Sequence, residues 1–338
     1  IISDVDVNNN VYFFRAYAEN SIGKSYSPIS KFGDVVVSGY YFIKNEDEFK
    51  AFYDEIVTQV KGSLYIGNTV AYSSTDRITV PGDTLVYFDK SGIDNIDYLN
   101  NLSYVEKGLY IVNTAVTDVN RISNIKHIER LWLEGNKIVS VPDFSNIAGL
   151  KTVNIARNNI SDYANILKLE NIDTLYLGNS AYPYYESNNI ANLTGLEALT
   201  NLKYLDLSGL PLHSWQVDEL KEAMPGCEIE FIPGNRAPFL PTLESVSTSI
   251  KDNKVTLKGY LTDKGAGAVT EYGFYLGKDK DNLEKISAGN GDLSNGTLFT
   301  YELEVYDEDV YYYAPYAINT YGESRSREFK EFTTSTIN

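Results

Sequence analysis

The sequence predicts an α/β repeat solenoid with a parallel sheet and short helical returns, followed by an all-β domain. Three observations predict it: a template that recurs between residues 62 and 231, a nearly constant step between its copies, and alternating strands with turn-rich linkers on both flanks. The template is apolar-x-apolar-x-x-Asn-x-apolar, as in 131–138 (LWLEGNKI) and 153–160 (VNIARNNI). Its first position recurs at Leu64, Leu85, Leu109, Leu131, Val153, Leu175, Leu205 and Ile229, with steps of 21, 24, 22, 22, 22, 30 and 24 residues.

Repetition at this period is the signature of a leucine-rich-repeat solenoid, in which each turn contributes one strand and needs its neighbours to bury its apolar side. Strand periodicity directs Leu131 and Leu133 to the interior, against Val153 and Ile155 of the next turn. Apolar residues spaced by three in 122–128 favour a tight 3-10 return on the outer side. The 22-residue step resembles the internalin-like repeats of bacterial surface proteins.

The template asparagines have a structural explanation. Asn136 and Asn158 are expected to turn their amides inward and satisfy backbone groups where the chain leaves the strand. The equivalent positions in the other turns carry different residues, so an incomplete ladder is expected: Thr69, Lys90, Thr114, Ser180 and Leu210.

Each end of the array is expected to carry a cap, so that the solenoid covers residues 38–233. Asn45 followed by acidic residues and an amphipathic pattern predicts an N-terminal cap helix over 45–60. A second helix is predicted over 214–224, ended by Pro225 and Gly226, before a closing strand at 228–232. Cys227 is the single cysteine, so an intrachain disulfide is excluded, and we interpret it as a buried structural thiol.

The flanks, 1–37 and 238–338, resemble each other. Aligning 11–25 with 310–324 leaves seven of fifteen residues identical, and both segments read as a strand entering an Asn-x-x-Gly turn with Gly23 or Gly322 at positive φ. The pattern is similar to the sixth strand of fibronectin type III modules, although Pro315 departs from it and suggests an edge or a bulge. Six strands are predicted in the C-terminal copy, at 243–250, 254–261, 271–276, 298–305, 310–318 and 325–333.

The N-terminal copy has room for only the last strands of such a module. An isolated half-module would leave an apolar face uncovered, so we expect residues 1–37 to be the C-terminal part of a fibronectin III-like module, with further modules upstream.

The composition limits the classes of molecule that the chain is expected to bind. The 46 acidic and 29 basic residues give a net charge of −17, which opposes binding to nucleic acid or anionic lipid headgroups. No run of 18 or more apolar residues is present to span a membrane, and the first ten residues do not read as a secretory signal.

The candidate binding surface is the concave side of the sheet, which takes the residues between the inward positions. Exposed aromatic residues in line are enriched where proteins bind other molecules. Tyrosine and tryptophan are also good formers of an exposed strand, so this alternative stays open. The candidate residues of this face are Tyr65, Tyr110, Trp132, Glu134, Asn154, Tyr176 and Asp206.

The 30-residue step carries an insertion of about eight residues that is rich in tyrosine. Insertions in repeat arrays project as surface loops and often serve binding. Packing of the tyrosines onto the adjoining turn is the alternative. The candidate contacts of this loop are Tyr182, Tyr184 and Tyr185.

No catalytic motif, phosphate-binding loop or paired metal ligand is recognisable, and the two histidines belong to distant turns. We therefore expect no enzyme activity, no cofactor and no metal site, and interpret acidic clusters such as 307–309 as solvated turns.

The leading hypothesis is a non-enzymatic recognition or adhesion protein that binds a protein or peptide on the concave face, with the β modules as spacers. Two alternatives remain: capture of a glycan by stacking on the aromatic stripe, and a structural stalk without a ligand of its own. The resemblance to surface proteins implies an extracytoplasmic location, at the cell surface or secreted.

Overall fold

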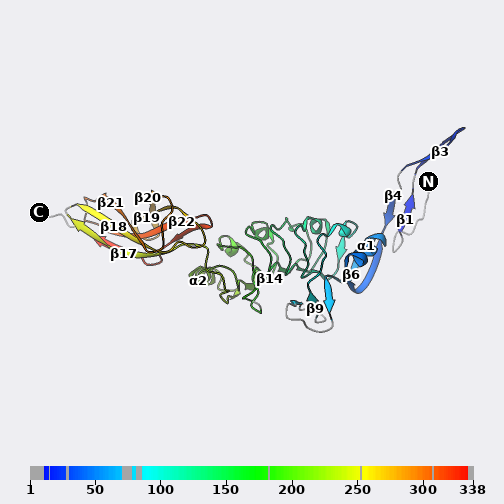
Figure 1. Ribbon diagram of the computed structural model, residues 1–338, viewed down its shortest axis with the longest axis horizontal. Coiled ribbons are helices and arrows are strands. Elements are labelled where there is room, and N and C mark those ends of the chain that lie inside the picture. Colours follow the sequence, from blue (N-terminus) through cyan, green and yellow to red (C-terminus); the bar gives the residue numbers. More distant parts are fainter. Residues whose placement is uncertain are drawn as a thin grey trace. The chain divides into compact units, whose positions relative to one another are not determined.

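The computed structural model describes residues 11–14, 16–27, 30–70, 78–80, 86–181, 183–251, 253–306 and 308–333. The chain divides into two compact units (Figure 1). The first contains residues 1–189, 194–209 and 220–232, and the second contains 190–193, 210–219 and 233–338.

The first unit is built around a parallel sheet. Its strands pair in the order β5-β6-β11-β12-β13-β14-β15-β16, with β10 beside the start of β6. The bounds are β5 Val35–Ile43, β6 Val57–Ile66, β10 Tyr104–Val105, β11 Gly108–Ile111, β12 Arg130–Trp132, β13 Thr152–Asn154, β14 Thr174–Tyr176, β15 Tyr204–Asp206 and β16 Glu228–Glu230. The template positions lie opposite one another and are buried, which confirms the predicted phase: Leu64, Leu109, Leu131, Val153, Leu175, Leu205 and Ile229.

One expected turn is missing from this ladder. Strand β6 pairs directly with β11, and the segment between them forms a separate antiparallel sheet of β7 (Asn68–Val70), β9 (Val86–Asp89) and β8 (Ile78–Val80). The prediction of a parallel-sheet turn around Leu85 is therefore wrong, although Leu85 itself lies outside the described residues. Phe88 of β9 lies opposite Thr69 of β7 and Ile78 of β8, so the position of β9 is set by this small sheet and not by the solenoid ladder.

Four of the outer returns contain short 3-10 helices, as predicted, and each helix buries one apolar residue; the return between β12 and β13 has no helix. The four helices are η1 (Asp97–Leu99), η2 (Asn120–Asn124), η3 (Ile166–Lys168) and η4 (Leu196–Ala198), which bury Leu99, Ile122, Ile166 and Leu196.

Inward-facing asparagines bind the backbone of consecutive turns. The Asn136 amide donates to the carbonyls of Ile111 and Leu133, both at 2.8 Å, and Asn158 donates to Leu133 and to its own turn. The next member is Asn188, not the expected Ser180: its amide donates to the carbonyls of Ile155 and Leu177. The inserted residues therefore precede the asparagine of their turn.

The N-terminal cap is a strand–helix–strand unit, in which β5, α1 (Glu46–Asp54) and β6 follow one another and the strands are parallel (Figure 1). Asn45 accepts from the Glu48 amide at 3.0 Å while Glu48 accepts from the Lys44 amide at 2.8 Å. The helix ends at Asp54, so its predicted extension to residue 60 is wrong. The β-branched residues of 57–60 begin strand β6 after a left-handed residue, Ile56, with φ 61°.

At the other end of the array, helix α2 covers Ser214–Ala223, close to the predicted range. Strand β16 is shorter than the predicted closing strand. Cys227 is half-buried, so the interpretation as a buried structural thiol is wrong as to its burial. Partial burial, together with the neighbouring Glu228 carboxylate, raises the pKa of this thiol.

Two antiparallel pairs precede the cap: β1 (Val11–Phe14) with β4 (Ser30–Gly33), and β2 (Tyr17–Asn20) with β3 (Gly23–Tyr26). Asn20 accepts from the backbone of Ile22 and Gly23 in the predicted turn, and Gly23 has φ 156°.

The second unit contains two antiparallel sheets that share one core, an arrangement compatible with a β-sandwich. One sheet has the order β17-β18-β21, and the other β20-β19-β22-β23, with β24 also beside β22. The bounds are β17 Thr242–Lys251, β18 Lys254–Asp263, β19 Val269–Asp279, β20 Asn282–Asn290, β21 Thr297–Glu304, β22 Val310–Asn319, β23 Gly322–Arg325 and β24 Lys330–Thr333.

Sequence reasoning missed β20, because this polar strand has little apolar alternation. It also predicted one strand over 325–333, where the chain forms β23 and β24. Their interruption lies beside Pro315: β23 pairs with β22 up to Tyr316, β24 pairs with it up to Tyr313, and the Ser326 amide donates to the Pro315 carbonyl at 2.8 Å. Pro315 is thus neither at an edge nor in a bulge of its own strand; the neighbouring strand breaks beside it.

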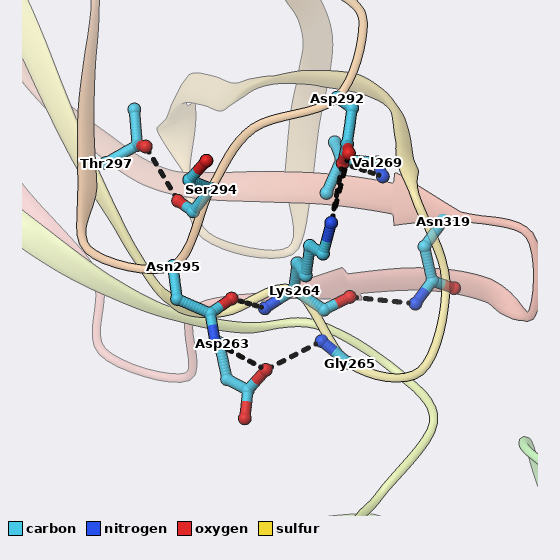
Figure 2. Close-up of polar contacts among 9 residues, drawn as sticks. All are labelled: Asp263, Lys264, Gly265, Val269, Asp292, Ser294, Asn295, Thr297 and Asn319. Atoms are coloured by element: carbon cyan, nitrogen blue, oxygen red, sulfur yellow. Dashed lines mark hydrogen bonds and ion pairs between the residues drawn. The ribbon is translucent and has the colours of Figure 1, made fainter.

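Loops at one end of the second unit are held by a polar network (Figure 2). Lys264 forms an ion pair with Asp292 at 3.0 Å, and its amide donates to Asn295 at 2.8 Å. The buried Asn319 amide donates to the carbonyls of Lys264 and Phe239. The asparagine of the Asn-x-x-Gly turn therefore fastens neighbouring loops in addition to its own turn.

Candidate functional site

An aromatic row crosses the parallel sheet, as the strand phase predicts. Phe42, Tyr65, Tyr110 and Trp132 occupy matching positions in consecutive strands, and Tyr176 follows after Asn154. Ring centroids lie 4.9 Å apart for Phe42–Tyr65, 4.6 Å for Tyr65–Tyr110, 6.4 Å for Tyr110–Trp132 and 5.2 Å for Trp132–Tyr176. The row is therefore continuous in space although asparagine interrupts it in sequence.

The expectation that these side chains face solvent is wrong. Tyr65 and Tyr110 are 1% exposed and Trp132 is 4% exposed, whereas Tyr176 is half-buried. With Phe88 of β9 and Val112 they form a second hydrophobic cluster, separate from the interior of the solenoid, which we call the aromatic cluster: Tyr65, Phe88, Tyr110, Val112 and Trp132. Its role in the first unit is packing.

Two features explain this burial. Gly108 lies two residues before Tyr110 on the same face, and a Cβ there would approach the Tyr110 ring to 2.4 Å, so the ring occupies the space that a side chain would fill. Tyr65 and Tyr110 are parallel within 4°, and Phe88 reaches them from outside the repeats. The rings therefore cover one another.

Glu134 is a buried carboxyl group beside the aromatic cluster, 1% exposed. It accepts from Trp132 Nε1 at 3.0 Å, from Asn154 Nδ2 at 3.1 Å and from Asn179 Nδ2. Burial raises its pKa from 4.5 to about 7, against the opposing effects of the Arg157 charge and these hydrogen bonds. Desolvation is the dominant cause.

We predict a pH-dependent stability from Glu134. Between about pH 4.5 and 7 the unfolded chain is ionised here while the folded protein holds the proton. The contribution of Glu134 to the free energy of unfolding is therefore fully present below pH 4.5. It is lost as the pH rises through 7, and the loss is on the order of 3 kcal/mol. Urea denaturation of the protein and of Glu134→Gln across this range measures it. The difference in unfolding free energy between the two should change with pH; parallel curves would contradict the assignment.

Asn154 and Asp206, also predicted as concave contacts, are buried as well. Asn154 accepts from the Ala156 amide at 2.8 Å. The Asp206 carboxylate accepts from the amides of Ser180 and Ser208, at 2.7 and 2.8 Å, which fixes the start of the inserted loop. Their expected exposure is wrong, and the structure gives both a role in loop positioning.

The inserted loop does present tyrosines to solvent. Tyr184 is 63% exposed and Tyr185 is 42% exposed, while Pro183 between the loop and the array is buried. Tyr182 lies outside the described residues. A Cβ on Gly209 would come within 2.6 Å of the Pro183 carbonyl oxygen, so the loop packs closely on the following turn through its backbone. This anchoring leaves the two tyrosines at the surface.

A groove of about 590 Å³ lies at the carboxyl ends of the strands, on the loops that follow them. We call it the strand-end groove. Four successive loop segments and the inserted loop line it: Lys90–Ser91, Asn113–Ala115, Gly135–Lys137, Arg157–Asn159 and Tyr185–Glu186. Sequence reasoning did not identify it, because it placed the candidate site on strand residues.

Arg157 has an unusual backbone conformation in this groove. The equivalent residues of three consecutive turns are left-handed, with φ 54° at Asn113, 73° at Gly135 and 54° at Arg157. Glycine and asparagine adopt this region readily, whereas arginine does so at a cost of about 1 to 3 kcal/mol. The Arg157 guanidinium lies 4.8 Å from the Tyr185 ring centroid, and its charge acts to lower the pKa of Glu134. Comparing 113, 135 and 157 in the sequence would have revealed this position.

Within the described ranges, no group of three or more His, Cys, Asp or Glu side chains is arranged to hold a metal ion. No helix in the part of the chain that the structure describes is long and apolar enough to cross a membrane.

The strand ladder, the inward asparagines and the 3-10 returns together decide the class of the first unit. It carries a leucine-rich-repeat solenoid. No protein-family model matches the chain, and no curated protein matches it.

Several solved structures are similar. An internalin (inlF) of Listeria monocytogenes has 18% identity and a TM-score of 0.39, over 58% of this chain and 46% of that one. Internalin C2 of the same species has 25% identity and a TM-score of 0.34, over 42% and 58% of the two chains. A leucine-rich-repeat protein of Leptospira interrogans has 16% identity and a TM-score of 0.30, over 56% and 58%. The chain thus spans about half the length of each.

Proposed function

We propose that this chain is a non-enzymatic recognition protein that binds a protein or peptide along the solenoid, through the inserted loop and the strand-end groove. The observation that carries this proposal is the exposure of Tyr184 and Tyr185 on a loop anchored at its base. Exposed tyrosines contribute large contact areas at low cost in side-chain entropy, and insertions in repeat arrays often mark the binding face. The half-buried Tyr176 belongs to the aromatic row that continues from the aromatic cluster.

An extracytoplasmic location, at the cell surface or secreted, is part of the same proposal. Its support is the resemblance of the repeats to the internalin-like class. The C-terminal unit, which we propose to be fibronectin III-like, acts as a spacer, and so does the N-terminal segment.

The burial of the aromatic rings removes the support for glycan capture on the aromatic stripe. Stacking of a sugar needs an open ring face, and Tyr110 and Trp132 are covered by neighbouring rings. Buried polar candidates of the same face, such as Glu134, likewise have their hydrogen bonds filled within the protein.

A selection experiment tests the proposal. Peptides from a random phage-displayed library are selected on the immobilised chain, and the affinity of the enriched peptides is measured for the protein and for the double variant Tyr184→Ser/Tyr185→Ser. We expect the loss of both rings to weaken binding by about tenfold or more, since central aromatic residues dominate interface energies.

The matched control is Tyr321→Ser, which removes a tyrosine of similar exposure, 39%, from the second unit and should leave the affinity unchanged. Absence of any enriched peptide, or equal binding by the loop variant, would favour a structural stalk.

A further inference from the structure

The strand-end groove has a charge opposite to that of the chain. Its charged lining consists of Lys90, Lys137, Arg157 and one acid, Glu186, although acids outnumber bases by 46 to 29 in the whole sequence. We infer that the strand-end groove binds an acidic peptide segment, with Arg157 and Lys137 contacting its carboxylates. This inference rests on the proposed function and names the chemistry of the partner.

The position of Arg157 supports a carboxylate partner. The corresponding residues of the two preceding turns are Gly135 and Asn113, which suit the left-handed backbone that all three adopt. The chain keeps an arginine at this position, with its guanidinium over the Tyr185 ring at 4.8 Å from the centroid, beside the groove that both residues line. A guanidinium fork matches the geometry of a carboxylate.

The lysines extend this charge along the groove. Lys137 and Lys90 are exposed and belong to different turns, so their ammonium groups line the groove from separate loops. Lys137 follows Asn136, whose inward amide bonds fix the backbone at this point. A partner with several acids in succession would therefore meet several cations in succession.

The dimensions suit an extended peptide. Adjacent strands of a sheet are about 4.8 Å apart, so the three loops after β11, β12 and β13 alone span about 10 Å, the length of about three extended residues, and the segments of Lys90 and Tyr185 lengthen this path. The Tyr185 ring at the end of this path offers an apolar contact beside Arg157. An acidic segment containing an aromatic or aliphatic residue would use both.

The inference is tested with a fluorescently labelled peptide of about ten glutamates, a length that exceeds the groove. Its affinity for the full chain is measured by anisotropy, beside oligo-glutamine of the same length and polygalacturonate. We expect the glutamate peptide to bind in preference to both, and to bind more weakly at about 0.5 M salt, where charges are screened.

Two variants locate the contact. Lys137→Glu and Arg157→Gly should each raise the dissociation constant by about tenfold or more. Glycine suits the backbone at position 157, and circular dichroism verifies that both variants are folded. The control Lys126→Glu makes the same charge change at an exposed lysine before β12 and should alter the affinity less than about twofold.

Each other result overturns the inference: no binding of the glutamate peptide, equal binding of oligo-glutamine, preference for polygalacturonate, or unchanged affinity of Lys137→Glu. The proposed function fails separately. Library peptides without excess acid that still depend on Tyr184 and Tyr185 would refute the acidic partner and leave peptide recognition standing.

Discussion

Replacing Trp132 with alanine is expected to lower the free energy of unfolding of the first unit by about 3 to 5 kcal/mol, the range for a large side chain removed from a core. Its ring lies between Tyr110 and Tyr176, with centroids 6.4 and 5.2 Å away, and is almost completely buried. The change also removes the indole donor from Glu134, a buried group that needs its partners.

Urea denaturation followed by circular dichroism measures this effect. The matched control is Tyr184→Ala, an exposed aromatic residue in the same unit, which should change stability by less than about 0.5 kcal/mol. If Trp132→Ala proved as mild as its control, the aromatic cluster would have to be open to solvent, and the concave face would again be a candidate for stacking ligands.

Replacing Asn158 with alanine is expected to cost at least about 3 kcal/mol, because several buried backbone groups lose their partner at once. The Asn158 amide donates to the carbonyls of Leu133, Ile155 and Ala156, at 2.8 to 3.0 Å, and its oxygen accepts from the Ile138 amide at 3.0 Å. An alanine side chain has no donor or acceptor with which to replace these bonds.

Asn159→Ala is the control, since the adjacent asparagine is exposed and should contribute less than about 0.5 kcal/mol. Hydrogen exchange of the Ile138 amide, whose bond partner is removed, gives a local measurement. Unchanged protection of that amide in Asn158→Ala would contradict the inward ladder.

The sequence predicts the ladder well because repetition tests each position several times. Leu109, Leu131 and Val153 share one phase, and that phase sets the register of their strands. The sequence also contains the signal for Asn188, because the run Asn-x-Ile at 188–190 matches 136–138 and 158–160. The insertion shifts this run from the position that the regular step predicts.

The exposure of the candidate site could not be predicted in the same way. Strand phase gives the face on which Tyr110 lies, but whether the ring stands out or lies flat depends on Gly108 and on Phe88, which is in a separate sheet. Those contacts are not repeated, so no pattern in the sequence reports them. The same holds for the groove, which loops from five places form together.

The stacked pair Tyr65 and Tyr110 bridges the longest connection in the array. The step from Leu64 to Leu109 is 45 residues, about twice the regular 22, and doubling a connection costs about 0.6 kcal/mol in closure entropy. The contact between these two rings therefore helps to hold the cap strand β6 against β11, the first strand of the regular repeat turns. Weakening this stack would let the repeat turns separate from the cap and unfold from the amino end of the array. The concave face, predicted from the sequence to bind a ligand, therefore stabilises the array itself.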